Sequence, residues 1–455
     1  MSILKYLRVQ PFDTSSEEGR NAERYRLALW SVIANISSRG IAMLVMVLSV
    51  RWTLPYLGEE RFGVWMTIAS FVGMLIFLDL GVGNALTNHV AMVAADGNKA
   101  PLTRTVSGGL GLLFLIGLVS SIMLCLVFRS LPWESIIKVR NPLINAEIQQ
   151  ALFFFSILFG VSIFTSGVQK IFAGLQRSFE AHAASAVGSM LSLIVLWWAA
   201  RNNADIPVLL LATLGCQSIN GFLLLWLLRK RGIFRLQGIG SAIHAEKKTL
   251  LKIGGLFFVL QLGTMVGWGA DSLIISSTLG ATQVAVYSVT QRLFQFVSAP
   301  LAMVNAPLWS SYADAHVRGD HAFVRRTLKK SMFLTAGMAI AGGGLLVFFS
   351  QELVAWWTKG DILVPMAVVG AFFIWTLCES VGNSFAMMMN GCGVVREQVI
   401  AVMLLTVLAL PTKILFINYF GISGMIFSYA ALYCAVVVYM YGYVFRAKLI
   451  EKLGQ

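Results

Sequence analysis

Long runs of apolar residues alternate with short polar connections along almost the whole chain. Twelve runs reach about 20 mostly apolar residues, the length that a helix needs to cross a bilayer. They are residues 28–52, 62–85, 105–128, 148–169, 181–200, 207–228, 253–277, 284–309, 331–350, 362–386, 398–417 and 421–445. No connection between them is long enough for a separate soluble domain. The pattern predicts an all-α polytopic membrane protein with 12 transmembrane helices.

The composition excludes a soluble protein. Hydrophobic residues make up 57% of the 455 residues and charged residues only 12%, with a mean hydropathy of +0.76. An ordinary globular chain carries about 25% charged residues. So little charge cannot cover the surface of a soluble body of this size.

The net charge of +14 follows from membrane topology. If the N-terminus is cytoplasmic and the spans alternate, 25 of the 35 Lys and Arg residues fall in inner segments, eight in outer segments and two within spans. Cytoplasmic loops of membrane proteins carry such an excess of basic residues. We therefore expect a multi-pass membrane protein with both termini cytoplasmic, and no nucleic-acid partner.

An internal repeat relates the two halves of the chain. Shifting the sequence by 222 residues aligns 57–105 with 279–327, with ten of 49 positions identical, among them Leu-Gly in both copies. Duplicated halves are typical of transporters, whose substrate sites form where the repeats meet. We expect two related six-helix bundles around a central cavity. The expected parts are a cytoplasmic N-terminal segment (1–27), a first bundle (28–228), a basic cytoplasmic linker (229–252), a second bundle (253–445) and a cytoplasmic tail (446–455).

Two motifs carry a family resemblance: residues 57–65 read LGEERFGVW and residues 79–88 read DLGVGNALTN. With Asp271, Tyr287 and Asn390-Gly391 in the second half, they make the chain similar to the polysaccharide exporters of the O-antigen and capsule flippase family, within the multidrug/oligosaccharidyl-lipid/polysaccharide exporter superfamily. The resemblance implies a two-bundle fold that moves undecaprenyl-diphosphate-linked oligosaccharides from the inner to the outer leaflet of the bacterial plasma (inner) membrane. It also implies a glycan polymerase and a chain-length regulator as partners, besides membrane lipids.

Four basic residues are candidates for binding the substrate. Arg39 and Arg292 lie inside predicted spans, where a charge costs about 2.5–3.5 kcal/mol and must face a cavity or a partner. Guanidinium groups bind phosphate oxygens in a bidentate way, so we predict a cationic cavity for the diphosphate. Lys170 and Arg177 flank an inner turn where a headgroup would arrive. The alternatives are a structural pair with a buried acid for the first two, and ordinary positive-inside residues for the last two.

Three acidic residues within spans, Asp79, Asp271 and Glu379, are candidates for coupling transport to H+ or Na+. The alternatives are pairing with a basic residue and, for Asp79, capping of the Gly81-Val82-Gly83 turn. Pro300 lies mid-span and lacks a backbone donor, so it is a candidate hinge.

Lys413 and Arg51 sit near predicted outer ends of spans, where long basic side chains reach the interface by snorkelling. The histidines and cysteines show no metal-ligand spacing, and we expect no metal and no cofactor beyond a coupling ion.

The chain shows no phosphate-binding loop and no hydrolase motif, so we do not expect an enzyme. A cation-coupled multidrug antiporter of the same superfamily is an alternative, but it would favour acidic residues in the cavity. A membrane glycan polymerase or ligase is a second alternative, but it would need an extended outer loop for catalysis.

Overall fold

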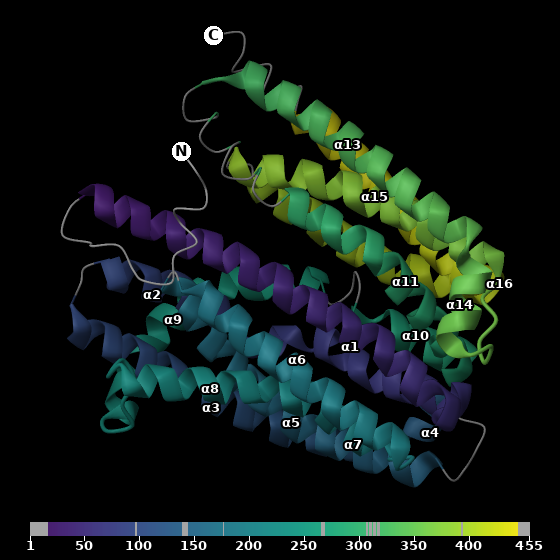
Figure 1. Cartoon of the computed structure of the whole chain (residues 1–455), viewed down its shortest axis with the longest axis horizontal. Helices are drawn as coiled ribbons and strands as arrows, with labels where there is room; N and C mark the ends of the chain where they lie inside the picture. The colour runs from purple at the N-terminus through teal and green to yellow at the C-terminus, as the bar shows by residue number, and fades with distance from the viewer. Residues whose placement is uncertain are drawn as a thin grey trace. The chain divides into compact units, whose positions relative to one another are not determined.

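The computed structural model describes residues 17–95, 98–138, 144–175, 177–264, 269–305, 319–392 and 395–444, with the single residues 308, 312 and 315. These residues are helical nearly throughout and form no strand (Figure 1). In the N-terminal part the elements are α1 (Glu17–Met74), η2 (Ile76–Asp79), α2 (Val82–Ala95), α3 (Lys99–Ser130), α4 (Trp133–Ile137), α5 (Ile144–Gly174), α6 (Ser178–Arg201), α7 (Ile206–Leu210), η3 (Leu211–Gly215) and α8 (Cys216–Lys230). They are followed by α9 (Ile239–Thr264), α10 (Asp271–Leu279), α11 (Ala281–Asn305), α13 (His321–Phe348), α14 (Ser350–Thr358), α15 (Met366–Gly391) and α16 (Val395–Val444).

The chain forms two compact units. The first unit comprises Met1–Tyr56, Leu75–Trp133 and Asn141–Gln261, and the second comprises Leu57–Met74, Glu134–Arg140 and Leu262–Gln455. The segment expected to be a linker, 229–252, holds the end of α8 and the first turns of α9, so most of it is helix. The predicted boundaries of the two bundles describe membrane topology and stay a prediction.

Close helix contacts in the first unit depend on glycine. Here α3 packs along α5, and α5 in turn packs against α2 and α8. A Cβ atom on Gly117 of α3 would lie 2.5 Å from the carbonyl oxygen of Gly160 on α5. Only residues without side chains allow this approach, which is a common device between membrane helices.

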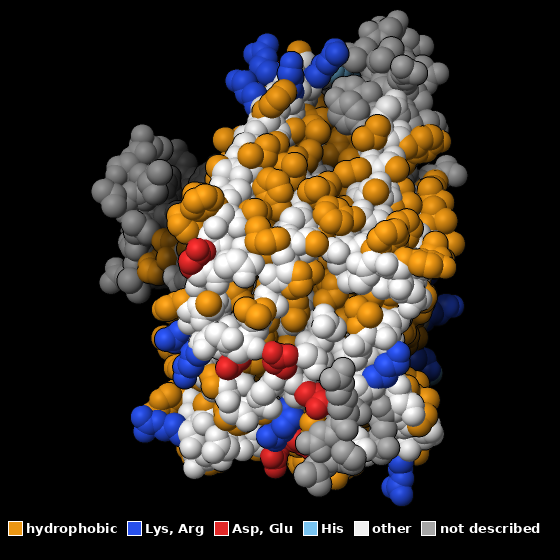
Figure 2. Space-filling model, turned by 90° about the vertical axis from the view of Figure 1, so that its right-hand side faces the viewer, with side chains coloured by type: hydrophobic (Ala, Val, Ile, Leu, Met, Phe, Trp, Pro, Cys, Tyr) orange, Lys and Arg blue, Asp and Glu red, His pale blue; other side chains and the backbone are white. Residues whose placement is uncertain are grey.

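The second unit is built around α15, which packs against α11, α13 and α16. One of its buried clusters contains Tyr312, Phe385, Met388 and Tyr429. By contrast, Phe333 and Phe348 on α13 are 70% and 78% exposed. Figure 2 shows the same arrangement on one face of the protein, where hydrophobic side chains fill the middle while Lys and Arg lie toward the edges. Such a surface suits the hydrocarbon core of a bilayer.

Eight helical segments among the described residues are long and apolar enough to cross a membrane. Two of them, Ile33–Asp79 and Gln398–Met440, contain 47 and 43 residues, and each is interrupted by a non-helical glycine, Gly58 or Gly421. A single span needs only about 20 residues.

One predicted span is broken where the sequence suggested a continuous helix. The span predicted at 62–85 is interrupted between Met74 and Val82. At this break Gly81 has φ +70°, and its Cα lies against the backbone of Gly254, where a Cβ would meet the carbonyl oxygen. A positive φ and this close approach both require glycine.

The internal repeat has a structural counterpart. Gly58 and Gly280, the matched glycines of the two Leu-Gly pairs, have φ angles of +71° and +94°. Each separates two successive helical runs. Within the second unit, Gly63 also lies against the backbone of Ala281. The two copies of the motif therefore make the same kind of turn.

Candidate functional site

A buried ion pair lies within the second unit. Lys413 on α16 and Asp271 on α10 are 142 residues apart in sequence, yet Lys413 Nζ lies 2.6 Å from Asp271 Oδ1. Lys413 is only 1% exposed and Asp271 9%. Removing one partner from such a pair leaves an unpaired buried charge, which costs about 3–5 kcal/mol.

Aromatic and amide groups complete the surroundings of this pair. Tyr287 on α11 donates its hydroxyl to Asp271 Oδ2 at 2.8 Å, and Gln291 Nε2 donates to the Tyr287 hydroxyl at 3.2 Å. The Lys413 ammonium lies 4.0 Å from the ring centre of Tyr429, a cation–π contact. Both carboxylate oxygens of Asp271 therefore have donors, and α10, α11 and α16 meet at one polar cluster.

The prediction that Lys413 snorkels to the interface is wrong. Its side chain is buried because Asp271 and the face of Tyr429 hold the ammonium inside the unit. A lysine four residues from the end of a predicted span is typical of snorkelling, and only the packing of α10 against α16 reveals the acidic partner. Gln291 and Tyr429 were not selected from the sequence, and Tyr287 was named only as part of the family resemblance.

Arg292 and Glu379 belong to the same unit. Arg292 follows Gln291 on α11, and its Nη2 lies 3.0 Å from the sulfur of Met66. Glu379 on α15 is partly buried, and within the described ranges its carboxylate forms no hydrogen bond or ion pair. Pro300 lies inside α11, which continues as helix to Asn305. The hinge at Pro300 stays a prediction.

The remaining predicted residues lie in the first unit. Arg39 is exposed on α1, where its Nε donates to Asn35 Oδ1 at 3.0 Å. Because Arg39 and Arg292 belong to different units, a shared diphosphate site stays a prediction.

Asp79 and Lys170 both bind groups near the start of α2. Asp79 Oδ1 accepts a hydrogen bond of 2.7 Å from the Gly81 backbone N–H, as the capping alternative expected. Lys170 on α5 is exposed, and its ammonium donates to Asn84 Oδ1 at 2.6 Å. Asp79 therefore stabilises the turn between η2 and α2, and Lys170 ties α5 to α2.

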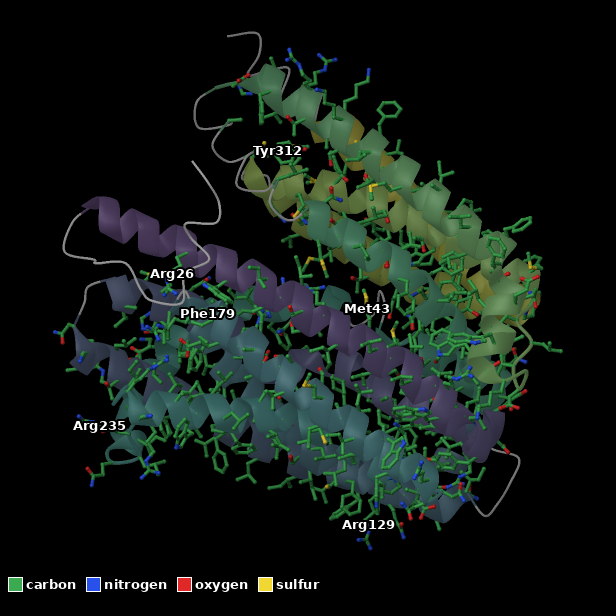
Figure 3. The ribbon with its side chains drawn as sticks, in the orientation of Figure 1. Arg26, Met43, Arg129, Phe179, Arg235 and Tyr312 are labelled. Atoms are coloured by element: carbon green, nitrogen blue, oxygen red, sulfur yellow. The ribbon has the colours of Figure 1, made fainter. Side chains whose placement is uncertain are left out.

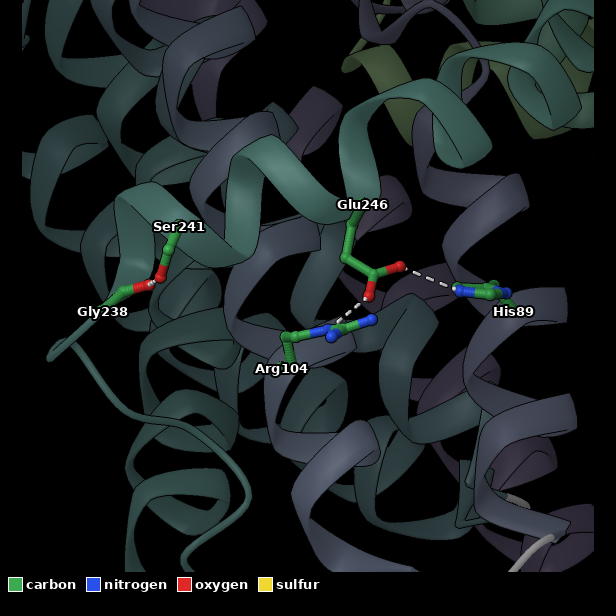
Figure 4. A network of polar contacts seen from close by, with 5 residues as sticks. All are labelled: His89, Arg104, Gly238, Ser241 and Glu246. Carbon is green, nitrogen blue, oxygen red and sulfur yellow. Dashed lines mark hydrogen bonds and ion pairs between the residues drawn. The ribbon is translucent and has the colours of Figure 1, made fainter.

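Two carboxylates at this end of the first unit each bind two basic groups. Glu180 Oε1 lies 2.9 Å from Arg177 Nη1, and Glu180 Oε2 lies 2.8 Å from Arg231 Nη2. Glu246 on α9 lies 3.0 Å from His89 on α2 and 3.2 Å from Arg104 on α3, and is 5% exposed (Figure 4). The second cluster joins three helices and was not predicted from the sequence.

The described residues contain no group of three or more His, Cys, Asp or Glu side chains that could hold a metal ion. Asp271, Lys413 and Glu246 are buried charged residues, and each is held in an ion pair.

Comparisons with known proteins agree with this architecture. A family model described as polysaccharide biosynthesis protein matches residues 26–312. A protein of Yersinia pseudotuberculosis named for O-antigen export is 20% identical over 416 residues, covering 90% of this chain and 94% of its own. Among solved structures, an inward-facing multidrug resistance transporter of the MATE family, MOP superfamily, has a TM-score of 0.73 at 15% identity, covering 90% of this chain and 97% of that one. The lipid II flippase MurJ, inward closed, has a TM-score of 0.72 at 12% identity, covering 91% and 87%.

Proposed function

Because the chain belongs to the polysaccharide biosynthesis protein family, we propose that it is a flippase for a lipid-linked oligosaccharide. The substrate would be an undecaprenyl-diphosphate-linked unit of O-antigen, capsule or exopolysaccharide, moved from the inner to the outer leaflet. The observation that carries this proposal is the family match, supported by a relative named for O-antigen export that aligns with 90% of the chain. The family resemblance of residues 57–65 and 79–88 is confirmed by that match.

We propose that the chain crosses the inner membrane twelve times, with both termini cytoplasmic, in bundles at 28–228 and 253–445. The two long apolar segments support this number, since at 1.5 Å per residue either one alone would be about twice as long as a bilayer core requires. The interruptions at Gly58 and Gly421 then separate one span from the next.

Arg39, Arg292, Lys170 and Arg177 are the proposed contacts of the diphosphate. Arg292 is the best supported, because it lies inside a predicted span, on the helix that also carries Tyr287 and Gln291. A guanidinium group can bind phosphate oxygens in a bidentate way.

Glu379 is the favoured coupling residue. Asp79 caps a turn and Asp271 is neutralised by Lys413, whereas Glu379 is partly buried with no partner in the described ranges. A partly buried carboxylate of this kind can bind H+ or Na+ during a transport cycle. No other cofactor is proposed, and the polymerase and the chain-length regulator remain proposed partners.

A multidrug antiporter is the second candidate, favoured by the shared fold with the MATE transporter. The Asp271–Lys413 pair neutralises one acid that a site for cationic drugs could use, so among the three acids predicted within spans Glu379 would have to supply that charge. A membrane polymerase or ligase has no such support.

Complementation tests the proposal. The chain is expressed in a strain that lacks its own O-antigen flippase, and surface glycan and drug sensitivity are both measured. We expect restored surface glycan with unchanged drug sensitivity. Increased drug resistance without restored surface glycan would instead identify an antiporter and overturn the flippase proposal.

A further inference from the structure

A deep apolar groove runs along the first unit between α3, α5, α8 and the start of α9. Its volume is about 1150 Å³, and Arg229 is its one charged lining residue among those described. Leu110 and Leu126 on α3 line it at positions 16 residues apart, so it extends about 24 Å at 1.5 Å per residue. A hydrocarbon core is about 30 Å thick, so the groove could follow most of that depth.

Glycines form part of the floor of the groove. Gly117 and Gly160, whose backbones lie in close contact between α3 and α5, both line it. Its wall carries a series of rings, with Phe164 6.1 Å from Phe114 and 6.3 Å from Phe222, measured between ring centres. An apolar trough with a glycine floor and aromatic walls can hold a long hydrocarbon chain.

A basic cleft of about 550 Å³ adjoins one end of the groove. The connection between α8 and α9 separates the two, because Phe234 and Leu236 line the groove while Arg235 between them lines the cleft. The backbone N–H of Arg235 donates to Ser107 Oγ at 3.0 Å, which fixes this connection on α3. In Figure 3 Arg235 lies at the end of the first unit opposite Arg129, which is at the end of α3.

Some of the basic residues that line the cleft have no acidic partner among the described residues. Lys99, Arg104, Arg231 and Arg235 line it. Arg104 pairs with Glu246 and Arg231 with Glu180, whereas Lys99 and Arg235 form no ion pair within the part of the chain that the structure describes. Arg229, at the same end of the groove, is likewise exposed and without an acidic partner there.

We propose that groove and cleft together form a loading site for the lipid-linked substrate before translocation. The polyprenyl chain lies in the groove, and the diphosphate lies in the cleft beside Lys99 and Arg235, with Arg229 at the adjoining end of the groove. The inference rests on the proposed function and assigns that substrate a second site, within the first unit alone. The single groove matches the single hydrocarbon chain of a polyprenyl diphosphate. A phospholipid, by contrast, has two acyl chains and one phosphate, so it would match the groove and the cleft less well.

Photocrosslinking of the full-length protein in nanodiscs tests this site. The probe is undecaprenyl diphosphate carrying a diazirine in its chain, and crosslinked peptides are mapped by mass spectrometry. We expect labelling concentrated on α3 and α8, with at least fivefold competition by undecaprenyl diphosphate and none by an equal amount of phosphatidylglycerol. Equal competition by phosphatidylglycerol, or labelling spread evenly over exposed helices, would show ordinary lipid contact and overturn the proposal.

Matched variants separate the two parts of the site. Leu118→Trp fills the groove, and Ile194→Trp on α6 is its control, because both side chains are exposed and only Leu118 lines the groove. Arg235→Gln removes a cleft charge, and Lys248→Gln on α9 is its control. We expect labelling to fall at least fivefold in Leu118→Trp and threefold in Arg235→Gln, and to stay within twofold in both controls. Unchanged labelling in Leu118→Trp would contradict the groove.

Failure of the loading-site proposal can be distinguished from failure of the flippase proposal. If the wild-type chain restores surface glycan while labelling is even over the helices, the flippase stands and the loading site falls. If the wild-type chain restores no glycan, the flippase proposal falls whatever the labelling pattern.

Discussion

Lys413 Nζ lies 2.6 Å from Asp271 Oδ1, across 142 residues of sequence and inside an apolar helical unit. The pair brings opposite charges to a place where neither would be stable alone. It fixes α16 to α10, and Tyr287 adds α11 through the second carboxylate oxygen. The polar cluster thus positions Gln291 and Arg292, which are neighbours of Tyr287 on α11.

The ion pair can be tested by a double-mutant cycle. Lys413→Met and Asp271→Asn should each lower stability by about 3–5 kcal/mol, because each leaves a buried group without its partner. The double variant should lose less than the sum of the two. Thermal unfolding of the purified protein in detergent measures this, and additive losses would show that the two residues do not interact.

Substitution of Arg292 should impair transport without impairing insertion. A hydrogen bond to a charged group contributes about 1.5–3 kcal/mol, so Arg292→Gln should lower surface glycan about 10- to 100-fold in the complemented strain, normalised to protein in the membrane. Arg292→Lys should retain part of the activity, since it keeps the charge but loses bidentate geometry. Arg325→Gln, on the exposed side of α13, is the control. Wild-type glycan in Arg292→Gln would remove Arg292 from the substrate site.

Glu379→Gln should uncouple transport from the ion gradient. The amide cannot bind a proton or Na+ as the carboxylate does, so flipping in reconstituted vesicles should stop responding to an imposed pH or Na+ gradient. Glu352→Gln, at an exposed position on α14, should respond as the wild type does. A full response in Glu379→Gln would mean that another group carries the ion.

The repeated glycines should tolerate alanine poorly. Gly58→Ala and Gly280→Ala place a Cβ on a residue with positive φ, which costs about 1–2 kcal/mol. Gly40→Ala on α1 is the control, because that glycine is within regular helix with open space around its Cα, and alanine there should be neutral or stabilising. Thermal unfolding distinguishes the sets, and equal stability of all three variants would argue against strain at the repeated turns.

Hydropathy and charge were sufficient to predict a helical, multi-pass membrane protein. The free-energy cost of placing a residue in lipid depends mainly on the type of that residue, so it can be judged from the sequence without knowing the packing. The family resemblance was carried by short motifs, of which Gly58 and Gly280 prove to be conformationally required. The break after Met74 is a different case. Gly81 signals a turn, but its contact with Gly254 depends on how two distant helices pack.

The site was less predictable than the fold. Arg292 and Glu379 stood out because a charge inside an apolar run is easily recognised. Lys413 did not, because its burial depends on an acid 142 residues away. The basic cleft at Arg235 was likewise hidden among residues that the positive-inside rule already explained. In each case the missing information was tertiary proximity rather than residue type.

The glycines at 58, 280 and 421 each end one helical run and begin the next within a single residue. During synthesis, two apolar runs therefore emerge from the ribosome with only a short connector between them, which at Gly58 is the charged triplet Glu59-Glu60-Arg61. Such closely spaced runs would reach the insertion machinery almost together, as one pair of helices. The compact turn thereby links the biogenesis of the protein to the same few residues that shape its fold.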